Sequence, residues 1–214
     1  MRFGLSKALL DFFYQRRYIE FENLISEDLR KKLLLEQEAL FEKKKIDTPT
    51  TPRVYQFNHN LFLSEPEFRK VALSFPFAEI ASQLMKKKSV RIAFDQLLWG
   101  TPSDTPLFPQ PLTLVDLSSI YPVLCGLIIT LRGGEFLEEP QPKEGNITFF
   151  SPKCEISFDY LNKGEIVQYL IVYTEDKALY LHNPSDLHTH SLKRQGLAFG
   201  DRLGEAHPLI LKPY

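Results

Sequence analysis

Sulfur-containing residues, tryptophan and histidine are scarce in this sequence. Its 214 residues include two cysteines, two methionines, one tryptophan and five histidines. Cys125 and Cys154 lie in apolar segments and form no close pair, so we expect buried, reduced thiols rather than the disulfide framework of a small secreted domain. No histidine lies between His59 and His182. The middle of the chain therefore lacks the side chain that most often binds iron or zinc.

The chain also lacks a long apolar run and an excess of charge. No apolar segment approaches the ~20 residues that a membrane-spanning helix needs, and Lys7 and Asp11 interrupt the apolar N-terminus, which has no small-residue cleavage site. With 26 basic and 27 acidic residues the net charge is −1, which excludes a general attraction to nucleic acid or anionic lipid. We expect a cytoplasmic protein with no membrane partner and no specific DNA binding.

Apolar residues make up 43% of the chain, which is enough for one sizeable core. We therefore expect a single domain over residues 1–214, with a mainly helical part at 1–89 and a β-rich core and tail at 90–214. Apolar residues at helical spacing predict helices over residues 5–16 and 77–85. Ser26, as N-cap, predicts a further helix that ends at the lysines 43–45, and Pro66 in a first turn predicts another short helix.

Two lysine triplets follow the predicted helices, at residues 43–45 and 86–88. Cations at a helix C-terminus complement the negative end of the helix dipole. We expect this role for both triplets, in preference to a phosphate clamp.

The second part of the sequence has the pattern of strands, predicted over residues 18–21, 90–99, 112–117, 123–131, 155–160, 166–173 and 178–182. The segment 155–160 alternates polar and apolar residues, which places Phe158 in the core and Asp159 in solvent. A turn at 161–164 predicts that this strand pairs with the next as a hairpin. Helices followed by strands, without βαβ alternation, predict an α+β fold with an antiparallel sandwich or barrel.

Asp95 lies inside an apolar strand, where a carboxylate needs a partner or solvent. Arg91 is four residues earlier on the same predicted face, so we expect the two to pair. Trp99 ends the strand, and we expect it to pack in the core rather than to bind a ligand.

The tail groups His182, Asp186, His188 and His190 within a few residues. Nitrogen and carboxylate ligands at such short spacing can hold zinc or iron. Histidines in polar loops are more often free of metal, so these four are only weak metal candidates.

Four segments carry a family resemblance, and they are YIEFENLISEDLRKKL, RIAFDQLLWGTP, GNITFFSPKCEISFDY and GLAFGDRLGEAHPLI. Their order resembles that of phytanoyl-CoA dioxygenase-like proteins, which are Fe(II)/2-oxoglutarate oxygenases. The resemblance implies an antiparallel double-stranded β-helix (jelly roll) with N-terminal helices packed on it. The whole sequence also resembles a chlamydial protein named as a Fur-like, divalent-cation-dependent regulator.

The residues that such oxygenases need are missing from the matching positions. The resemblance places the first histidine and acid at 107–110 or 114–116, the distal histidine at 154–157, and a basic residue for 2-oxoglutarate at 166–173. These segments contain no histidine and no basic residue, and Asp116 is the only acid in the first two. We therefore expect no catalytic iron centre and no cofactor.

Three hypotheses remain. The first is an oxygenase scaffold with a degenerate active site that binds a small-molecule ligand or a protein partner. The second is a metal-responsive, Fur-like repressor that uses the histidine tail and the lysine triplets. The third is an oxygenase with non-standard ligands among Asp95, Glu155 and Asp159.

Overall fold

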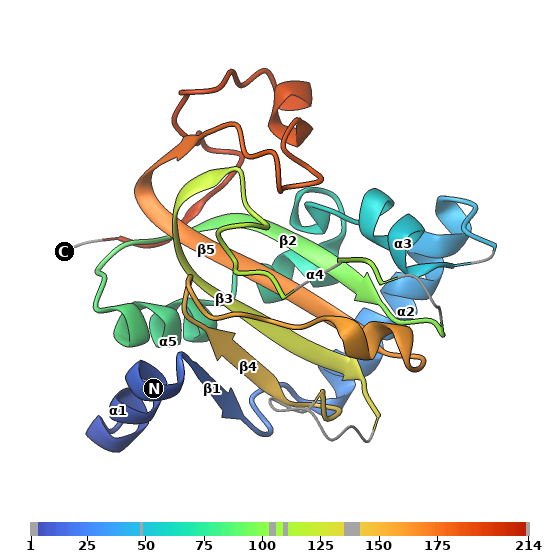
Figure 1. Ribbon diagram of the computed structural model, residues 1–214, viewed down its shortest axis with the longest axis horizontal. Coiled ribbons are helices and arrows are strands. Elements are labelled where there is room, and N and C mark those ends of the chain that lie inside the picture. The colour runs from blue at the N-terminus through green and yellow to red at the C-terminus, as the bar shows by residue number, and fades with distance from the viewer. Residues whose placement is uncertain (1–3, 48, 103–105, 109–110, 135–141, 213–214) are drawn as a thin grey trace.

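The computed structural model describes residues 4–47, 49–102, 106–108, 111–134 and 142–212. Five helices precede most of the strands (Figure 1). The elements are α1 (Lys7–Arg16), β1 (Tyr18–Phe21), α2 (Glu27–Lys43), α3 (Thr51–Phe57), η1 (Leu61–Leu63), α4 (Pro66–Ala72), α5 (Phe75–Met85), β2 (Val90–Trp99), β3 (Ile120–Arg132), β4 (Ile147–Phe150), η2 (Asp159–Asn162), β5 (Val167–Tyr180), η3 (Ser191–Gln195) and β6 (Leu209–Leu211).

The strands form one curled antiparallel sheet with the order β1-β4-β3-β5-β2-β6 (Figure 1). The long strand β5 lies inside the sheet, paired with β3 on one side and β2 on the other. Both faces of β5 are covered, which explains why its first half is nearly continuous in apolar residues.

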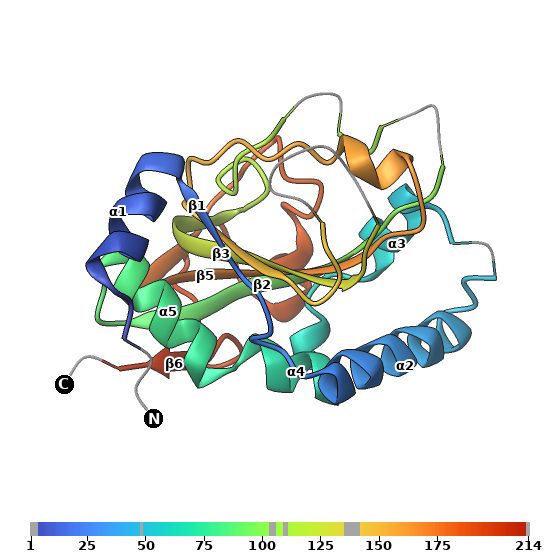
Figure 2. The same cartoon turned by 90° about the horizontal axis from the view of Figure 1, so that it is seen from below.

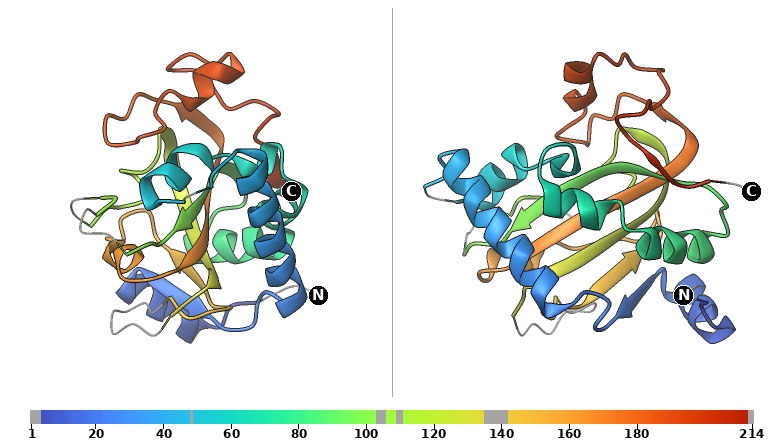
Figure 3. Two further views of the ribbon diagram at one scale, coloured as in Figure 1. Left: turned by 90° about the vertical axis from the view of Figure 1, so that its right-hand side faces the viewer. Right: turned by 180° about the vertical axis from the view of Figure 1, so that it is seen from behind.

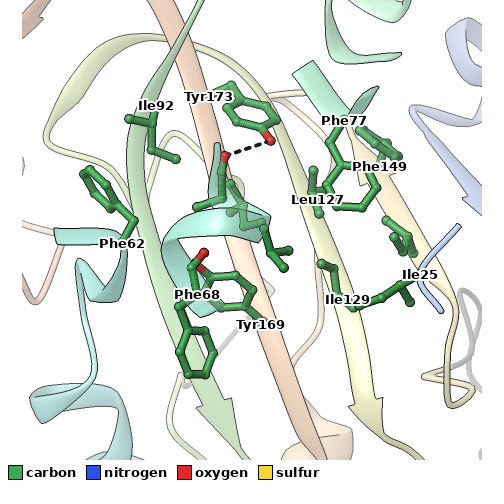
Figure 4. Close-up of a cluster of buried hydrophobic side chains, with 14 of the residues drawn as sticks. Ile25, Phe62, Phe68, Phe77, Ile92, Leu127, Ile129, Phe149, Tyr169 and Tyr173 are labelled. Atoms are coloured by element: carbon green, nitrogen blue, oxygen red, sulfur yellow. Dashed lines mark hydrogen bonds between the residues drawn. The ribbon is translucent and has the colours of Figure 1, made fainter. Parts of the chain in front are cut away.

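Helices cover one face of this sheet (Figures 2 and 3). The rings of Phe68 and Tyr169 meet edge to face with centroids 4.8 Å apart, and the Tyr173 hydroxyl donates to the Ala72 carbonyl at 3.2 Å (Figure 4). These contacts bind α4 to β5. We call this layer the helix-side core.

The other face of the sheet forms a second apolar cluster, which we call the barrel-side core. Its members include Phe94, Ile128 and Leu170 from the sheet. The opposite wall contributes Leu114 and Phe158. That opposite wall consists of turns, short 3-10 helices and isolated bridges such as Leu112 to Ile156. The molecule is thus an α+β jelly roll with helices on one side, as expected.

The predicted strand over 155–160 is wrong. Only Ile156 makes a bridge, to Leu112, and Asp159–Asn162 is a 3-10 helix. The proposed hairpin partner β5 already pairs with β2 and β3 along its two edges, so no edge is left for this segment. The alternation in burial is nevertheless confirmed, because Phe158 is 5% exposed and Asp159 is exposed.

Two other strand predictions need correction. Residues 114–117 form a turn, with Leu112 as the one bridged residue of the predicted strand 112–117. Residues 178–180 continue β5 instead of forming a separate strand. The strands at 18–21 and 90–99 and the Ser26 cap of α2 are confirmed; the Ser26 hydroxyl accepts from the Leu29 N–H at 3.3 Å.

The predictions for the two cysteines and for Trp99 are confirmed. Cys125 and Cys154 are buried free thiols. Trp99 packs against Phe41 with ring centroids 5.2 Å apart. In the part of the chain that the structure describes, no helix combines the length and the apolar character needed to cross a bilayer.

Candidate ligand site

The positions expected to hold an iron centre are apolar or locally bonded. Leu114 is fully buried in the barrel-side core. The Asp116 carboxylate accepts from the Thr113 N–H at 2.8 Å and from its hydroxyl at 2.7 Å, so it closes a turn. Cys154 is buried and its thiol donates to the neighbouring Glu155 carbonyl at 3.6 Å. Pro109 and Gln110 lie outside the described residues.

Three polar side chains inside the barrel form a hydrogen-bonded chain. The Tyr160 hydroxyl donates to Gln168 Oε1 at 2.7 Å, and Gln168 Nε2 donates to Thr130 Oγ1 at 3.1 Å. Across the described ranges, no three His, Cys, Asp or Glu residues are grouped so that they could hold a metal ion. The residues at these positions do not fit an Fe(II) centre, which needs nitrogen and carboxylate ligands with open positions.

The four tail candidates separate into two places. Asp186 is buried, and its Oδ1 accepts from the His188 backbone N–H at 2.7 Å. His182 and His190 instead lie on the exposed side of the tail against Phe199, with their ring centroids 6.0 Å apart. The tail therefore does not assemble the four-residue metal site.

His188 belongs to a stack of four aromatic rings. Its ring lies parallel to that of His59, with centroids 4.2 Å apart, and its other face covers Tyr55 at 5.0 Å. Phe94 of β2 covers the far face of His59 at 5.3 Å. We call His59 and His188 the histidine pair. Both of its faces are covered, so only the ring edges are free to meet a ligand.

The histidine pair is held neutral. Burial and the neighbouring His188 lower the pKa of His59 well below its usual value. Burial also lowers the pKa of His188 to about 4, against a smaller opposing effect of its hydrogen bond to the Tyr55 carbonyl at 3.2 Å. A neutral imidazole carries one donor and one acceptor nitrogen. The single N–H of neutral His188 is used by the Tyr55 carbonyl, so at neutral pH His188 offers one acceptor, His59 offers one donor and one acceptor, and neither carries charge.

The histidine pair forms part of the wall of a cavity of about 720 Å³ between α3, η1 and the tail. We call it the histidine cavity. Among its described lining residues the one permanently charged side chain is Arg194, and none is a carboxylate. Asn60 also lines it, is 8% exposed, and has an Oδ1 without a hydrogen-bond partner in the described chain. The other lining residues are Pro52, Tyr55, Gln56, Phe57, Leu63, Ser64, Leu107, Leu187, His190, Ser191 and Gln195.

His59 is the residue of this site that the sequence did not reveal. Only the fold brings it to His188, because the two residues lie far apart in the sequence. One local signal was present: His59 lies between two asparagines after a short helix, and both asparagines are buried. Buried polar residues in a connecting segment are more often functional than residues of the packed core.

The expected pair of Asp95 and Arg91 is wrong. Arg91 instead pairs with Asp176 at 2.9 Å. A bulge in β2 between Ile92 and Phe94 shifts the alternation, so Asp95 turns to the helix-side core. There its carboxylate accepts from the Tyr169 hydroxyl and from the Phe62 N–H at 2.8 Å.

Burial raises the pKa of Asp95 to about 7, against the effect of the hydrogen bonds that it accepts. Glu155 and Asp159 are exposed, and Asp95 lies on the helix side of the sheet. These three acids do not meet, so the set of non-standard oxygenase ligands is not assembled.

The fold is that of the Fe(II)/2-oxoglutarate-dependent oxygenases. The carbocyclase SnoK from nogalamycin biosynthesis, a non-heme α-ketoglutarate-dependent enzyme, superimposes with a TM-score of 0.71 at 17% identity over 96% of each chain. The epimerase SnoN from the same biosynthesis gives 0.68 at 14% identity, over 95% of this chain and 98% of its own. CT296 from Chlamydia trachomatis gives 0.51 at 17% identity, over 82% of this chain and 99% of its own.

No protein-family model and no curated protein sequence matches this chain. At such low identities the structural similarity establishes the fold alone.

We predict that anaerobic titration with Fe(II) gives no stoichiometric site inside the barrel and that 2-oxoglutarate is not turned over. The reason is that Leu114, Cys154 and Gln168 occupy the interior where ligands would be needed. One-to-one binding of iron that is abolished by substitutions in β3 or β5 would contradict this prediction.

Proposed function

We propose that this protein binds a small organic anion in the histidine cavity, on a scaffold shared with oxygenases but without their iron chemistry. The supporting observation is the neutral histidine pair in a cavity whose described lining contains Arg194 and no carboxylate. A cavity of this volume is in the usual range for small-molecule sites.

The lining suggests how such a ligand is held. Arg194 supplies a planar, permanently charged donor group suited to a carboxylate. The edges of the histidine pair and the unpartnered Oδ1 of Asn60 provide the hydrogen bonds that fix the orientation of the ligand. Leu63 and Leu187 supply apolar surface. The combination favours an organic acid that carries a hydroxyl or N–H group over an inorganic anion.

The test is native mass spectrometry of the purified protein, followed by calorimetry with aromatic and aliphatic carboxylates and with their uncharged amides. We expect a carboxylate to bind and its amide to bind at least ~10-fold more weakly, because one charge-assisted hydrogen bond contributes about 1.5–3 kcal/mol. Arg194→Gln should remove this preference. Lys193→Gln is the matched control, since Lys193 is an exposed neighbour that contacts Phe199 outside the cavity.

The proposal fails if carboxylates and amides bind equally well, or if both variants behave alike. It also fails if no member of the panel saturates the protein and no ligand is retained on purification.

The repressor hypothesis makes a separate prediction. We expect only weak, sequence-independent DNA binding that disappears near physiological salt. Lys43 pairs with Glu65 at 3.3 Å, Lys87 pairs with Glu175 at 2.9 Å, and Lys44 donates to Asn58 Oδ1 at 3.0 Å. The lysine triplets are thus partly engaged within the protein. A footprint on a defined operator that requires a divalent cation and persists at physiological salt would overturn this prediction.

A further inference from the structure

A second hollow lies where the ends of α1 and α5 meet the start of β3 and the segment after β4. Its volume is about 420 Å³, and we call it the α1 groove. Phe13 and Val123 line it and are 1% and 7% exposed. Tyr14 and Tyr121 also line it and are 45% and 57% exposed. The groove therefore has an apolar floor between two exposed aromatic rings.

Positive charge surrounds this apolar floor. Arg17 and Lys153 line the groove, and Lys86 Nζ lies 4.8 Å from the centre of the Tyr14 ring. None of the described lining residues is an acid, and none of these three cations forms an ion pair with a described carboxylate. In a chain with a net charge of −1, three unpaired cations around one apolar hollow are a local concentration of charge.

The backbone fixes the position of Arg17. It is the C-cap of α1 in the left-handed conformation, with φ of 65°, and its N–H donates to the Phe13 carbonyl at 2.7 Å. One guanidinium nitrogen, Nη1, donates to the Lys153 carbonyl at 3.2 Å. A guanidinium has five N–H donors, so the group is held in place and still has donors for a ligand.

We propose that the α1 groove binds an amphipathic organic anion, an acyl chain ending in a carboxylate. The chain lies on Phe13, Met85 and Val123, and the carboxylate meets Arg17 and Lys153. Burial of the apolar chain stabilises the complex, and the charge-assisted hydrogen bonds select the anion. A volume of about 420 Å³ suits a small molecule better than a protein surface.

Calorimetric titration of the full chain with monomeric dodecanoate tests the proposal. In the Arg194→Gln background, in which the histidine cavity has lost its cation, we expect one saturable site, with dodecyltrimethylammonium binding at least ~10-fold more weakly because its charge is reversed, and acetate more weakly still because it has no chain. Equal binding of the cationic and anionic probes would overturn the proposal, as would the absence of saturable dodecanoate binding.

Variants locate the site. Arg17→Gln and Lys153→Gln should each weaken dodecanoate binding by about 10-fold, whereas Arg16→Gln, an exposed neighbour outside the groove, should not. Since Arg17 also bonds to the chain, Lys153→Gln is decisive if Arg17→Gln unfolds the protein. Arg194→Gln should leave unchanged the dodecanoate binding that Lys153→Gln weakens, which separates this site from the histidine cavity. A dimer in light scattering that Tyr121→Ser dissociates would show that a second copy of the chain closes the groove, and would also refute the proposal.

Discussion

Replacement of Phe158 by alanine is expected to lower the free energy of unfolding by about 3–5 kcal/mol, the usual range for an aromatic side chain removed from a packed core. Phe158 is 5% exposed, and its ring lies 5.4 Å from that of Phe108 and 6.3 Å from that of Tyr160. The wall opposite the sheet consists of turns and short 3-10 helices, with no second sheet among the described residues. Buried side chains such as Phe158 therefore hold this wall against the sheet. Denaturant unfolding of the variant measures the loss.

Asp159→Ala is the matched control for Phe158→Ala. Asp159 is the next residue and is exposed, so its removal should cost less than about 1 kcal/mol. Equal and small losses for the two variants would mean that this segment does not fill the barrel, and the description of the barrel-side core would then be incorrect.

The same segment shows what the sequence could and could not predict. The alternation around Phe158 correctly predicted which side chains are buried, because burial depends on the local direction of each side chain. It did not predict pairing, which depends on whether a neighbouring strand has a free edge. Here β5 has none, since β2 and β3 occupy both edges. Caps such as Ser26 were predictable because their hydrogen bonds are local.

The site depended on features that are not local. A bulge in β2 moved Asp95 from the face predicted by simple alternation, and no residue in the segment identifies that bulge. The contact between His59 and His188 forms only when α3, β2 and the tail come together. The fold could thus be predicted from segment order and resemblance. The assembly of the histidine pair could not.

The stability of the protein is expected to fall steeply as the pH is lowered below about 6.5. His188 and His207 have folded pKa values of about 4, lowered by burial, and burial lowers the pKa of His59 in the same direction. His207 is completely buried, and neither ring nitrogen has a partner in the described chain. The pKa of each histidine in the unfolded state is 6.5. As the pH falls, the unfolded state therefore binds protons at these three residues before the folded state does, and the folded state loses stability.

Asp95 acts in the opposite direction. Its pKa is about 7 when folded and 3.8 when unfolded, so between these values the folded state holds one proton that the unfolded state lacks. Between about pH 4 and 6.5 the unfolded state therefore binds up to three more protons at the histidines, the folded state binds one more at Asp95, and the difference is at most two. Two protons correspond to a slope of about 2.7 kcal/mol per pH unit. Burial also raises the pKa of Asp186 and Glu36, which makes this slope an upper bound.

Urea unfolding at a series of pH values between 4.5 and 8 (about one measurement per half unit) tests this balance. We expect a loss of up to about 5 kcal/mol over two pH units below 6.5, which is comparable to the whole stability of many domains. His188→Gln should reduce the slope by about 1.4 kcal/mol per pH unit, because one of the three histidine protons no longer contributes. His182→Gln is the control, since His182 lies on the exposed side of the tail against Phe199. A stability that is flat or rises toward acid would show that Asp95, and not the histidines, dominates the pH dependence of the fold.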